Sequence, residues 1–401
     1  MAAALAITLA ASGALAAPQL AWLEGLSIDA LFWLRDQAYG PAHAPDSSPT
    51  VVIAIDEETY RRKPFADVPV ALWTRELAGV LNEVVAGGAK VVGFDVILPT
   101  SAERFLPGFD REFLVALRNA ARDNKIVLGK VQHQQLPIRP FPGQSFAVGH
   151  QRNIRSVNLF RDEDEVIRRV PLYFESDDLD AGKRSETSLA LELAARALGE
   201  TPETEPDGVV RLGAWRIPGY QRNVLTANFA GGATAGMPVF SLADLHACAA
   251  IGNQAFFREK FSGKVVLVGT ILDVEDRKLT SMRFITGPEG GGPEGGGDVA
   301  RCVHPPMREI FHQDVVRDSI PGVLVHATAV NNLLRRDALS ELAPQVYMAF
   351  TAVLALAASV PAMTLAPLLA GLVIAGGIAA WAGVAAVAVR GGLVLPLLDP
   401  V

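Results

Sequence analysis

The chain has 401 residues, 43 acidic and 36 basic side chains, and a formal net charge of −7 at pH 7. Binding to nucleic-acid phosphates requires clustered Lys and Arg, so this balance argues against a nucleic-acid partner. Two cysteines are too few for a disulfide framework or a four-cysteine zinc site. The length leaves room for one domain of about 300 residues together with membrane segments.

The N-terminal segment contains no charged side chain over residues 1–23 and is rich in Ala and Leu. We interpret it as an N-terminal transmembrane helix or signal anchor that is not removed. The alternative is a cleaved signal peptide with a small-residue site at residues 14–16. A signal peptide opens with Lys or Arg, and this segment has neither, so the uncleaved helix is favoured.

The body of the chain, residues 24–340, has the pattern of a water-soluble α/β domain. Strands are predicted at residues 51–55, 90–98 and 126–129, and helices at 24–40, 68–87 and 109–123. The strand segments are continuous apolar runs, which is typical of strands buried on both faces. Alternating strands and helices predict an α/β fold, namely a mixed, largely parallel sheet with helices on both faces.

The second half of this domain has a less regular pattern. Short strands are predicted at residues 148–150, 156–159, 169–174 and 223–229, a longer strand at 264–270, and helices at 186–198 and 321–334. The mixed charge run at residues 161–169 predicts a solvated turn between two strands. The Gly-rich repeat at 287–298 predicts a loop.

The C-terminal segment contains no Asp, Glu, Lys, Arg or His over residues 344–389. A spanning helix needs about 20 apolar residues, so this stretch is long enough for two. Prolines at 361 and 367 predict the turn, which gives transmembrane helices at about 343–360 and 366–389. Residues 393–401 are predicted to start a truncated third helix, with a short interfacial tail as the alternative. Transmembrane helices are therefore expected at both ends of the chain.

The order of these segments predicts the topology. If the first helix enters from the cytoplasm, residues 24–340 lie in the periplasm or the extracellular space. The chain is then a multi-pass protein of the cell inner membrane. In such an oxidising compartment Cys248 and Cys302 form a disulfide, and two unpaired thiols are the alternative.

Carboxylates lie at or just beyond the ends of several predicted strands. In an open parallel sheet, ligands bind in the crevice beyond the carboxyl ends of the strands. Grouped carboxylates there bind a cation or a cationic ligand, or else they cap helices and hold arginines. His326, within an apolar helical pattern, is expected to be a core residue, and a partly exposed histidine titrates near neutral pH. The candidate ligand-binding residues are Asp56, Glu57, Asp95, Asp273, Asp276, Arg277 and His326.

Catalytic and cofactor motifs are absent from the sequence. It contains no GxxxxGK[ST], HExxH, GxSxG or CxxC, so we assign no catalytic residue, metal or cofactor. Cys302, His304 and His312 share a short segment, but a structural zinc site needs four ligands at defined spacing. We interpret these three as incidental residues of a surface loop.

Several motifs follow one another in an order that resembles a known family: VVIAIDEETYRR, KVVGFDVIL, NLFRDEDEVIRRVPL, ETSLALELA, FSGKVVLVGTILDVEDRKLTS and PGVLVHATAVNNLLRRDAL. The family is the type-2 CHASE domain, an extracellular sensor of bacterial transmembrane receptors. The resemblance covers about residues 24–340. It implies one membrane helix before the sensor and three after it, then a cytoplasmic output domain such as an adenylate or guanylate cyclase, a kinase or a diguanylate cyclase. No output domain is expected within these residues, and the segment at 282–319 is longer than the family pattern.

The expected function is therefore that of a sensor module rather than an enzyme. The resemblance implies an unknown small-molecule or periplasmic ligand and a homodimer. Small residues in the predicted spans permit close helix packing, which agrees with a dimer. Two alternatives remain: a membrane-anchored extracytoplasmic enzyme with a carboxylate-lined site, and an adhesion or scaffold module.

Overall fold

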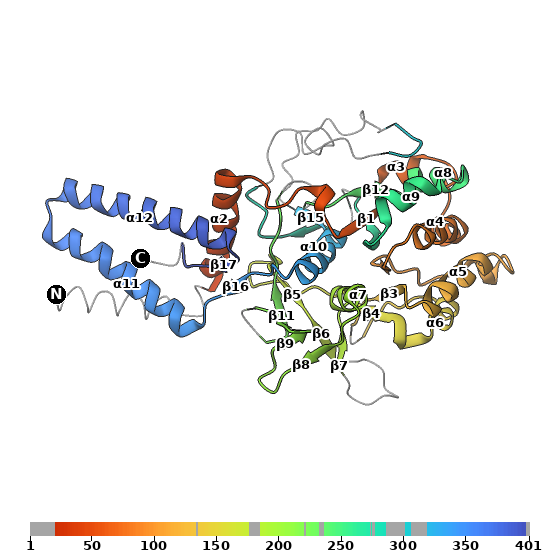
Figure 1. The fold of residues 1–401 in the computed structure, drawn as a ribbon, viewed down its shortest axis with the longest axis horizontal. Helices are drawn as coiled ribbons and strands as arrows, with labels where there is room; N and C mark the ends of the chain where they lie inside the picture. Colours follow the sequence, from red (N-terminus) through yellow and green to blue (C-terminus); the bar gives the residue numbers. More distant parts are fainter. Residues whose placement is uncertain are drawn as a thin grey trace.

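The structure is a computed structural model of the whole chain (Figure 1). It describes residues 21–133, 135–175, 185–219, 222–231, 236–272, 274, 277–285, 301–305 and 319–397. The expected membrane helix at 1–23 lies outside the described residues, except for the last three positions. The Gly-rich repeat and His312 also lie outside them.

A six-stranded sheet forms the centre of the domain, and all of its neighbouring strands are parallel. Its strands, in spatial order, are β12 (Val239–Ser241), β1 (Thr50–Ile55), β13 (Val265–Thr270), β2 (Val91–Phe94), β3 (Ile126–Lys130) and β4 (Ile154–Ser156). Apolar and β-branched side chains dominate β1 and β13, and these strands are buried on both faces. The predicted largely parallel sheet is confirmed.

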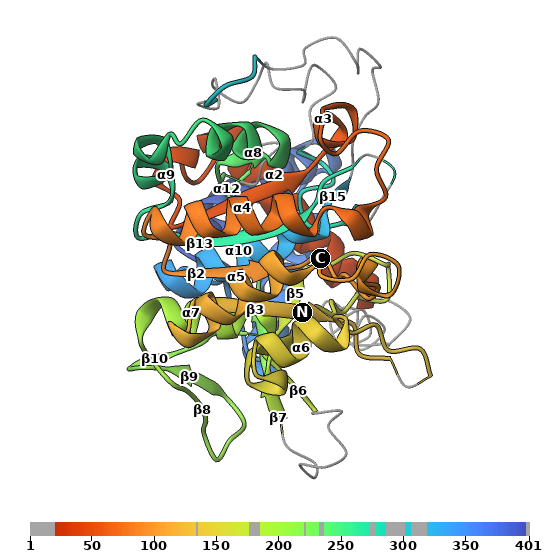
Figure 2. The same cartoon turned by 90° about the vertical axis from the view of Figure 1, so that its right-hand side faces the viewer.

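Helices cover both faces of this sheet. The face on the far side from the C-terminal helices carries α4 (Thr74–Ala86), α5 (Arg111–Arg122), α8 (Leu242–Ala250) and α9 (Gln254–Phe261) (Figure 2). The opposite face carries α7 (Leu189–Leu198) and α10 (Gly322–Arg335). Each layer encloses its own apolar core. Short helices α3 (Glu57–Arg61) and α6 (Pro142–Ala147) lie in the connections after β1 and β3.

Small antiparallel pairs surround the main sheet. They are β5 (Arg169–Pro171) with β11 (Val224–Thr226), β6 (Tyr173–Glu175) with β7 (Ser185–Thr187), β14 (Arg277–Leu279) with β15 (Ser319–Pro321), and β9 (Val210–Leu212) with β8 (Pro202–Thr204) and β10 (Trp215–Arg216).

The strand predicted at 148–150 is wrong. Gly149 is left-handed there and precedes a 3₁₀ helix, His150–Asn153, which is incompatible with extended chain.

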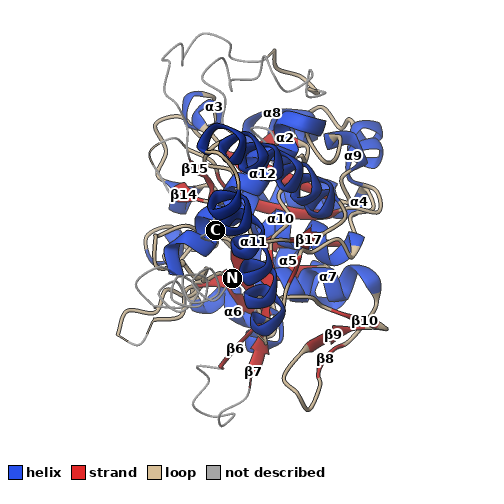
Figure 3. Ribbon diagram, turned by 90° about the vertical axis from the view of Figure 1, so that its left-hand side faces the viewer, coloured by secondary structure: helices blue, strands red, loops and turns tan. Residues whose placement is uncertain are grey.

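Two long helices, α11 (Pro344–Thr364) and α12 (Pro367–Arg390), project side by side from one end of the domain (Figures 1 and 3). Both are long and apolar enough to cross a membrane, and most of their surface is exposed. The chain turns at residues 365–366, within the predicted turn at 359–361 and 364–367, but Pro361 lies inside α11, so the first helix ends at Thr364 rather than at about residue 360. Proline removes a hydrogen bond from the turn that precedes it and leaves the helix after it intact, so α11 continues for three more residues.

The chain after α12 returns to the domain instead of starting a helix at residue 393. Gly392 is left-handed, with a φ of 86°, and β17 (Leu393–Val394) pairs in parallel with β16 (Ser340–Glu341). The amide of Ser340 donates to the carbonyl of Gly392 at 2.7 Å. The predicted third helix therefore does not form over residues 393–397, and residues 398–401 lie outside the described part.

Candidate functional site: the edge of the sheet and a charged junction

Asp56 lies at the carboxyl end of β1 and caps helix α3. Its Oδ1 accepts the Thr59 amide at 2.8 Å, the Thr59 hydroxyl at 2.6 Å and the Ser241 hydroxyl at 2.9 Å. Burial raises the pKa of Asp56, and these hydrogen bonds oppose that rise. The Asp56 carboxylate therefore acts as the N-cap of α3. Glu57, in the first turn of α3, is half-buried.

Asp95 and His326 lie together beyond β2. The Nε2 of His326 is 3.6 Å from Oδ1 of Asp95 and 3.1 Å from the carbonyl oxygen of Val157. His326 is buried on α10, as expected for a core histidine. The structure therefore brings Asp95 and His326 together. Asp56 lies at the end of β1, which strand β13 separates from β2, and makes a different set of contacts.

The remaining predicted site residues do not form a common carboxylate cluster in the described structure. Asp273 and Asp276 lie outside the described residues. Arg277, on β14, donates to the carbonyl of Ser319 and so ties β14 to β15. Its observed contact is therefore to the backbone of a neighbouring strand.

A buried ion pair at the carboxyl end of β3 was not anticipated. Lys130 is fully buried, and its Nζ lies 2.8 Å from Oε1 of Glu186 and 3.3 Å from Oε1 of Gln151. Gln132 donates to the same Glu186 oxygen at 2.7 Å. Sequence analysis did not single out this lysine because it ends an otherwise apolar strand, IVLGK. Its charge is compensated by Glu186, which lies far away in the sequence.

Metal binding finds no support in the described part of the chain, where no three His, Cys, Asp or Glu side chains are grouped in a way that holds an ion. The polar groups named above instead hydrogen-bond to one another or to the backbone.

A second charged cluster lies at the other side of the domain, where α2 (Ala21–Tyr39) crosses between the sheet domain and the C-terminal helices (Figure 1). Arg168, which is 1% exposed, makes a bidentate pair with the fully buried Asp29 of α2, at 2.7 and 2.9 Å. The same guanidinium donates to Asp162 at 2.9 Å and to Asp164 at 2.7 and 2.8 Å. Arg283 adds a second contact to Asp29 at 2.8 Å.

This cluster corrects the prediction of a solvated turn at residues 161–169. Burial alone lowers the pKa of Arg168, but hydrogen bonds to Asp164 and Asp29 outweigh it and raise the pKa. The arginine is therefore held in its charged form. Bidentate charge-assisted pairs also have strict geometry, so this contact fixes the position of α2 on the domain.

Arg169, the next residue, contacts the segment that precedes α11 in the sequence. Its guanidinium binds Glu341 on β16 at 2.7 and 3.1 Å. The hydroxyl of Thr226 also donates to Glu341. Asp162 lies 3.3 Å from Arg169 and 2.9 Å from Arg168, so one carboxylate connects the two arginines.

Helix α2 also contacts α12 and the segment that follows it. The guanidinium of Arg390, at the end of α12, lies 4.4 Å from the ring centre of Tyr39, the last residue of α2. Near the other end of α2, the Ser27 hydroxyl accepts the Leu397 amide at 2.8 Å. We call the set Asp29, Asp162, Asp164, Arg168, Arg169, Arg283 and Glu341 the charged junction.

The family model of the CHASE2 domain matches residues 2–368. The chain belongs to the CHASE2 domain family. No curated protein and no solved structure matches it. A CHASE2 domain is an extracellular sensory module, which agrees with the resemblance seen in the sequence.

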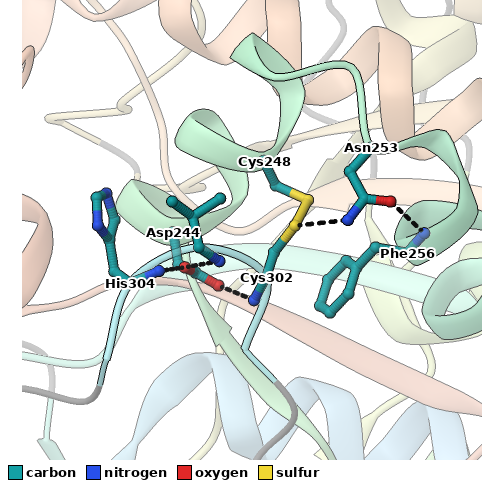
Figure 4. The surroundings of a disulfide bond; sticks show 7 residues. Asp244, Cys248, Asn253, Phe256, Cys302 and His304 are labelled. Atoms are coloured by element: carbon teal, nitrogen blue, oxygen red, sulfur yellow. Dashed lines mark hydrogen bonds between the residues drawn. A yellow bond between two sulfur atoms is a disulfide. The ribbon is translucent and has the colours of Figure 1, made fainter.

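A disulfide crosses this CHASE2 domain on the face that carries α8. Cys248 of α8 is bonded to Cys302, with 5.6 Å between the Cα atoms (Figure 4). Asn253 donates a hydrogen bond to the sulfur of Cys302 at 3.4 Å. The structure thus forms the bond that the sequence left open between a disulfide and two free thiols.

The carboxylate of Asp244 holds the same segment of the CHASE2 domain through its backbone. It accepts the amides of Cys302 at 2.9 Å, Val303 at 3.0 Å and His304 at 2.7 Å (Figure 4). Arg301 adds a bidentate pair to Glu58 of α3 at 2.6 and 2.7 Å. The segment at 301–305 is therefore attached firmly to α3 and α8.

Proposed function

We propose that this CHASE2 domain is the extracytoplasmic sensor of a bacterial membrane receptor. Residues 24–340 lie in the periplasm or outside the cell, and α11 and α12 cross the inner membrane together with the transmembrane helix expected from the sequence of residues 1–23. A cytoplasmic output domain, such as a cyclase, a kinase or a diguanylate cyclase, receives the signal. The observation that carries the proposal is the charged junction, which attaches both membrane-proximal segments to one point of the domain.

The membrane location is supported by the surface of the C-terminal helices. Large apolar side chains such as Leu368, Leu372 and Val387 are 60% or more exposed on α12. A soluble protein rarely exposes a contiguous apolar surface of this size, whereas hydrocarbon accommodates it. The disulfide supports an oxidising compartment for the sensor.

The transmission step follows from the two neighbouring arginines. A ligand acts on the receptor when it has different affinities for two arrangements of the domain. Arg168 holds α2 through Asp29, and Arg169 holds the start of α11 through Glu341. A shift of this short segment therefore moves the N-terminal and C-terminal membrane connections together. In a homodimer, such a shift changes how the helices of the two subunits meet.

The ligand contact is assigned to the carboxyl end of the sheet. Asp95 and His326 are the part of the predicted set that lies together, and α10 carries His326. Because α10 packs between the main sheet and the segments of the junction, a ligand that opens this edge displaces a helix of the shared core. A small molecule or a periplasmic protein fits this role, and no catalytic step is assigned to these residues.

Two experiments test the proposal. Alkaline phosphatase fused after residue 250 should be active in cells, and β-galactosidase fused there should be inactive, because the fusion point is outside. For signalling, the chain is followed by one added spanning helix and an adenylate cyclase catalytic domain. Arg169→Gln should change the basal cyclase output at least about fivefold, the lower range of an allosteric coupling.

The control variant is Arg211→Gln, in a surface pair with Glu203 on another hairpin. It removes the same charge and should leave the cyclase output unchanged. Equal output from the two variants would show that the junction carries no signal.

A further inference from the structure

Helix α2 lies at the level where the C-terminal helices leave the membrane. Arg390 ends α12, and arginines at span ends place their charged group at the interface. Its contact with Tyr39 puts the end of α2 at that level. The contact between Ser27 and Leu397 holds the other half of α2 against the chain that leaves α12. The helix therefore runs across the ends of the C-terminal helices rather than away from them (Figures 1 and 3).

An open apolar hollow lies on α2 between these two contacts. It is lined by Ala30, Trp33 and Phe284. Trp33 is 43% exposed and Phe284 is 47% exposed, although the neighbouring α2 residues Leu31 and Phe32 are completely buried. Trp33 lies about 9 Å along the helix from Tyr39, from the rise of 1.5 Å per residue.

We propose that this hollow binds a bilayer lipid, with Trp33 in the headgroup region and Phe284 against the start of an acyl chain. The site lies next to the helices that run into the membrane, so lipid is the neighbour it meets first. Trp favours this level of the bilayer because its ring is amphipathic. Apolar side chains left in water at this position are better explained by a lipid contact than by solvent.

The lipid site is connected to the charged junction. The guanidinium of Arg283 lies 4.9 Å from the ring centre of its neighbour Phe284 and 2.8 Å from Asp29. A lipid that packs against Phe284 therefore lies next to Arg283, which binds Asp29 of α2. The inference rests on the proposed membrane anchoring and adds the bilayer itself as a partner that bears on the position of α2.

Tryptophan fluorescence of the full chain in nanodiscs tests the site. The discs contain phosphatidylcholine, either unlabelled or brominated on one acyl chain close to its carbonyl group. Subtracting the emission of Trp33→Phe from that of the wild type isolates Trp33. Brominated lipid should reduce this difference emission by roughly half, because bromine quenches a ring at the headgroup level.

Two further variants make the outcomes separable. Trp381→Phe isolates a tryptophan within α12, about 14 Å along the helix from Arg390, so its membrane insertion is read in separate discs whose lipid is brominated deep in the acyl chain. Phe146→Trp, in the Trp33→Phe background, places an exposed ring at the opposite end of the domain, where Phe146 is 72% exposed on α6. That ring should not be quenched.

The expected pattern is quenching of Trp33 and Trp381 but not of the ring at position 146. Quenching of Trp381 without Trp33 overturns the lipid site and leaves the anchoring intact. If Trp33→Phe then also lowers the fraction of dimer, the hollow belongs to an interface between two copies of the chain. Absence of quenching at Trp381 overturns the membrane anchoring, and the lipid site falls with it.

Discussion

Arg168 and Arg169 are adjacent in the chain, yet their guanidinium groups bind carboxylates that are far apart in the sequence. Arg168 binds Asp29, 139 residues earlier, and Arg169 binds Glu341, 172 residues later. Asp162 contacts both arginines. A displacement of either residue would therefore change the contacts of the other, and the proposed joint movement of α2 and the segment before α11 rests on this arrangement.

Loss of the Arg168 side chain should be strongly destabilising. Among the described residues, Arg168→Met leaves Asp29 buried with Arg283 as its remaining cationic partner, and breaking a buried pair from one side costs about 3–5 kcal/mol. Urea unfolding of the detergent-solubilised chain measures this change. Arg211→Met removes an exposed arginine and should cost less than about 1 kcal/mol. Similar losses for both variants would mean that the buried cluster contributes no special stability.

The sheet could be predicted from the sequence because its strands are locally distinctive. The runs that became β1, β13 and β3 are apolar and β-branched, and their burial on both faces needs no information beyond the run itself. Helix α10 was likewise recognisable from its apolar pattern. The family resemblance, carried by the order of these segments, agrees with the match over residues 2–368.

The charged junction could not be predicted in the same way. A run of alternating charges is typical of a solvated surface, and only the tertiary position of Asp29 buries Arg168. The prediction of a helix from residue 393 onward failed for a similar reason, since this apolar run pairs instead with β16, which lies far away in the sequence. For Asp56 the structure shows the alternative that the sequence left open, since this carboxylate caps α3 by accepting the Thr59 amide.

Gly25 on α2 should be intolerant of a side chain. A Cβ at this position would lie 2.5–2.9 Å from the guanidinium atoms of Arg168, so Gly25→Ala must displace the buried pair. Gly79 on α4 has nothing within 4 Å of its Cβ position and is exposed. Gly79→Ala should therefore stabilise the chain by about 0.5–1 kcal/mol through helix propensity.

Thermal unfolding of the two glycine variants checks this contrast. Gly25→Ala should lower the melting temperature, and Gly79→Ala should raise it slightly. A rise in both would show that Arg168 moves aside without cost and that α2 is not held tightly.

The disulfide should contribute substantially to stability. Its cysteines are 54 residues apart, and closing a loop of that size removes about 4 kcal/mol of unfolded-chain entropy as an upper value. The reductant dithiothreitol should lower the melting temperature of the wild type and leave the Cys248→Ala/Cys302→Ala double variant unchanged. Production in a reducing cytoplasm should likewise yield a less stable chain, in keeping with the proposed location. A wild type whose melting is insensitive to reduction would contradict the prediction.

Acid should destabilise the domain partly through Glu192 on α7. Its carboxylate binds Arg196 at 2.6 Å, Arg155 at 3.0 Å and the Thr187 hydroxyl at 2.6 Å. Burial alone raises the pKa of Glu192, but the charges of Arg155 and Arg196 more than offset this, and its pKa is lowered below the ordinary value of 4.5. The unfolded chain then binds the proton more tightly, so this stabilisation is present above about pH 4.5 and is lost as the pH falls through the lower folded pKa.

Glu192→Gln keeps the shape and removes the charge, so it should lose about 1.5–3 kcal/mol at pH 7, the value of hydrogen bonds to charged groups. The difference from the wild type should shrink steadily below about pH 4.5, as the wild-type carboxyl is protonated as well. Glu203→Gln, at an exposed carboxylate, should follow the wild type at every pH within about 1 kcal/mol. Urea unfolding in a pH series measures the three proteins together. A constant gap between Glu192→Gln and the wild type down to pH values well below 4.5 would rule out protonation of Glu192 as a cause of acid unfolding.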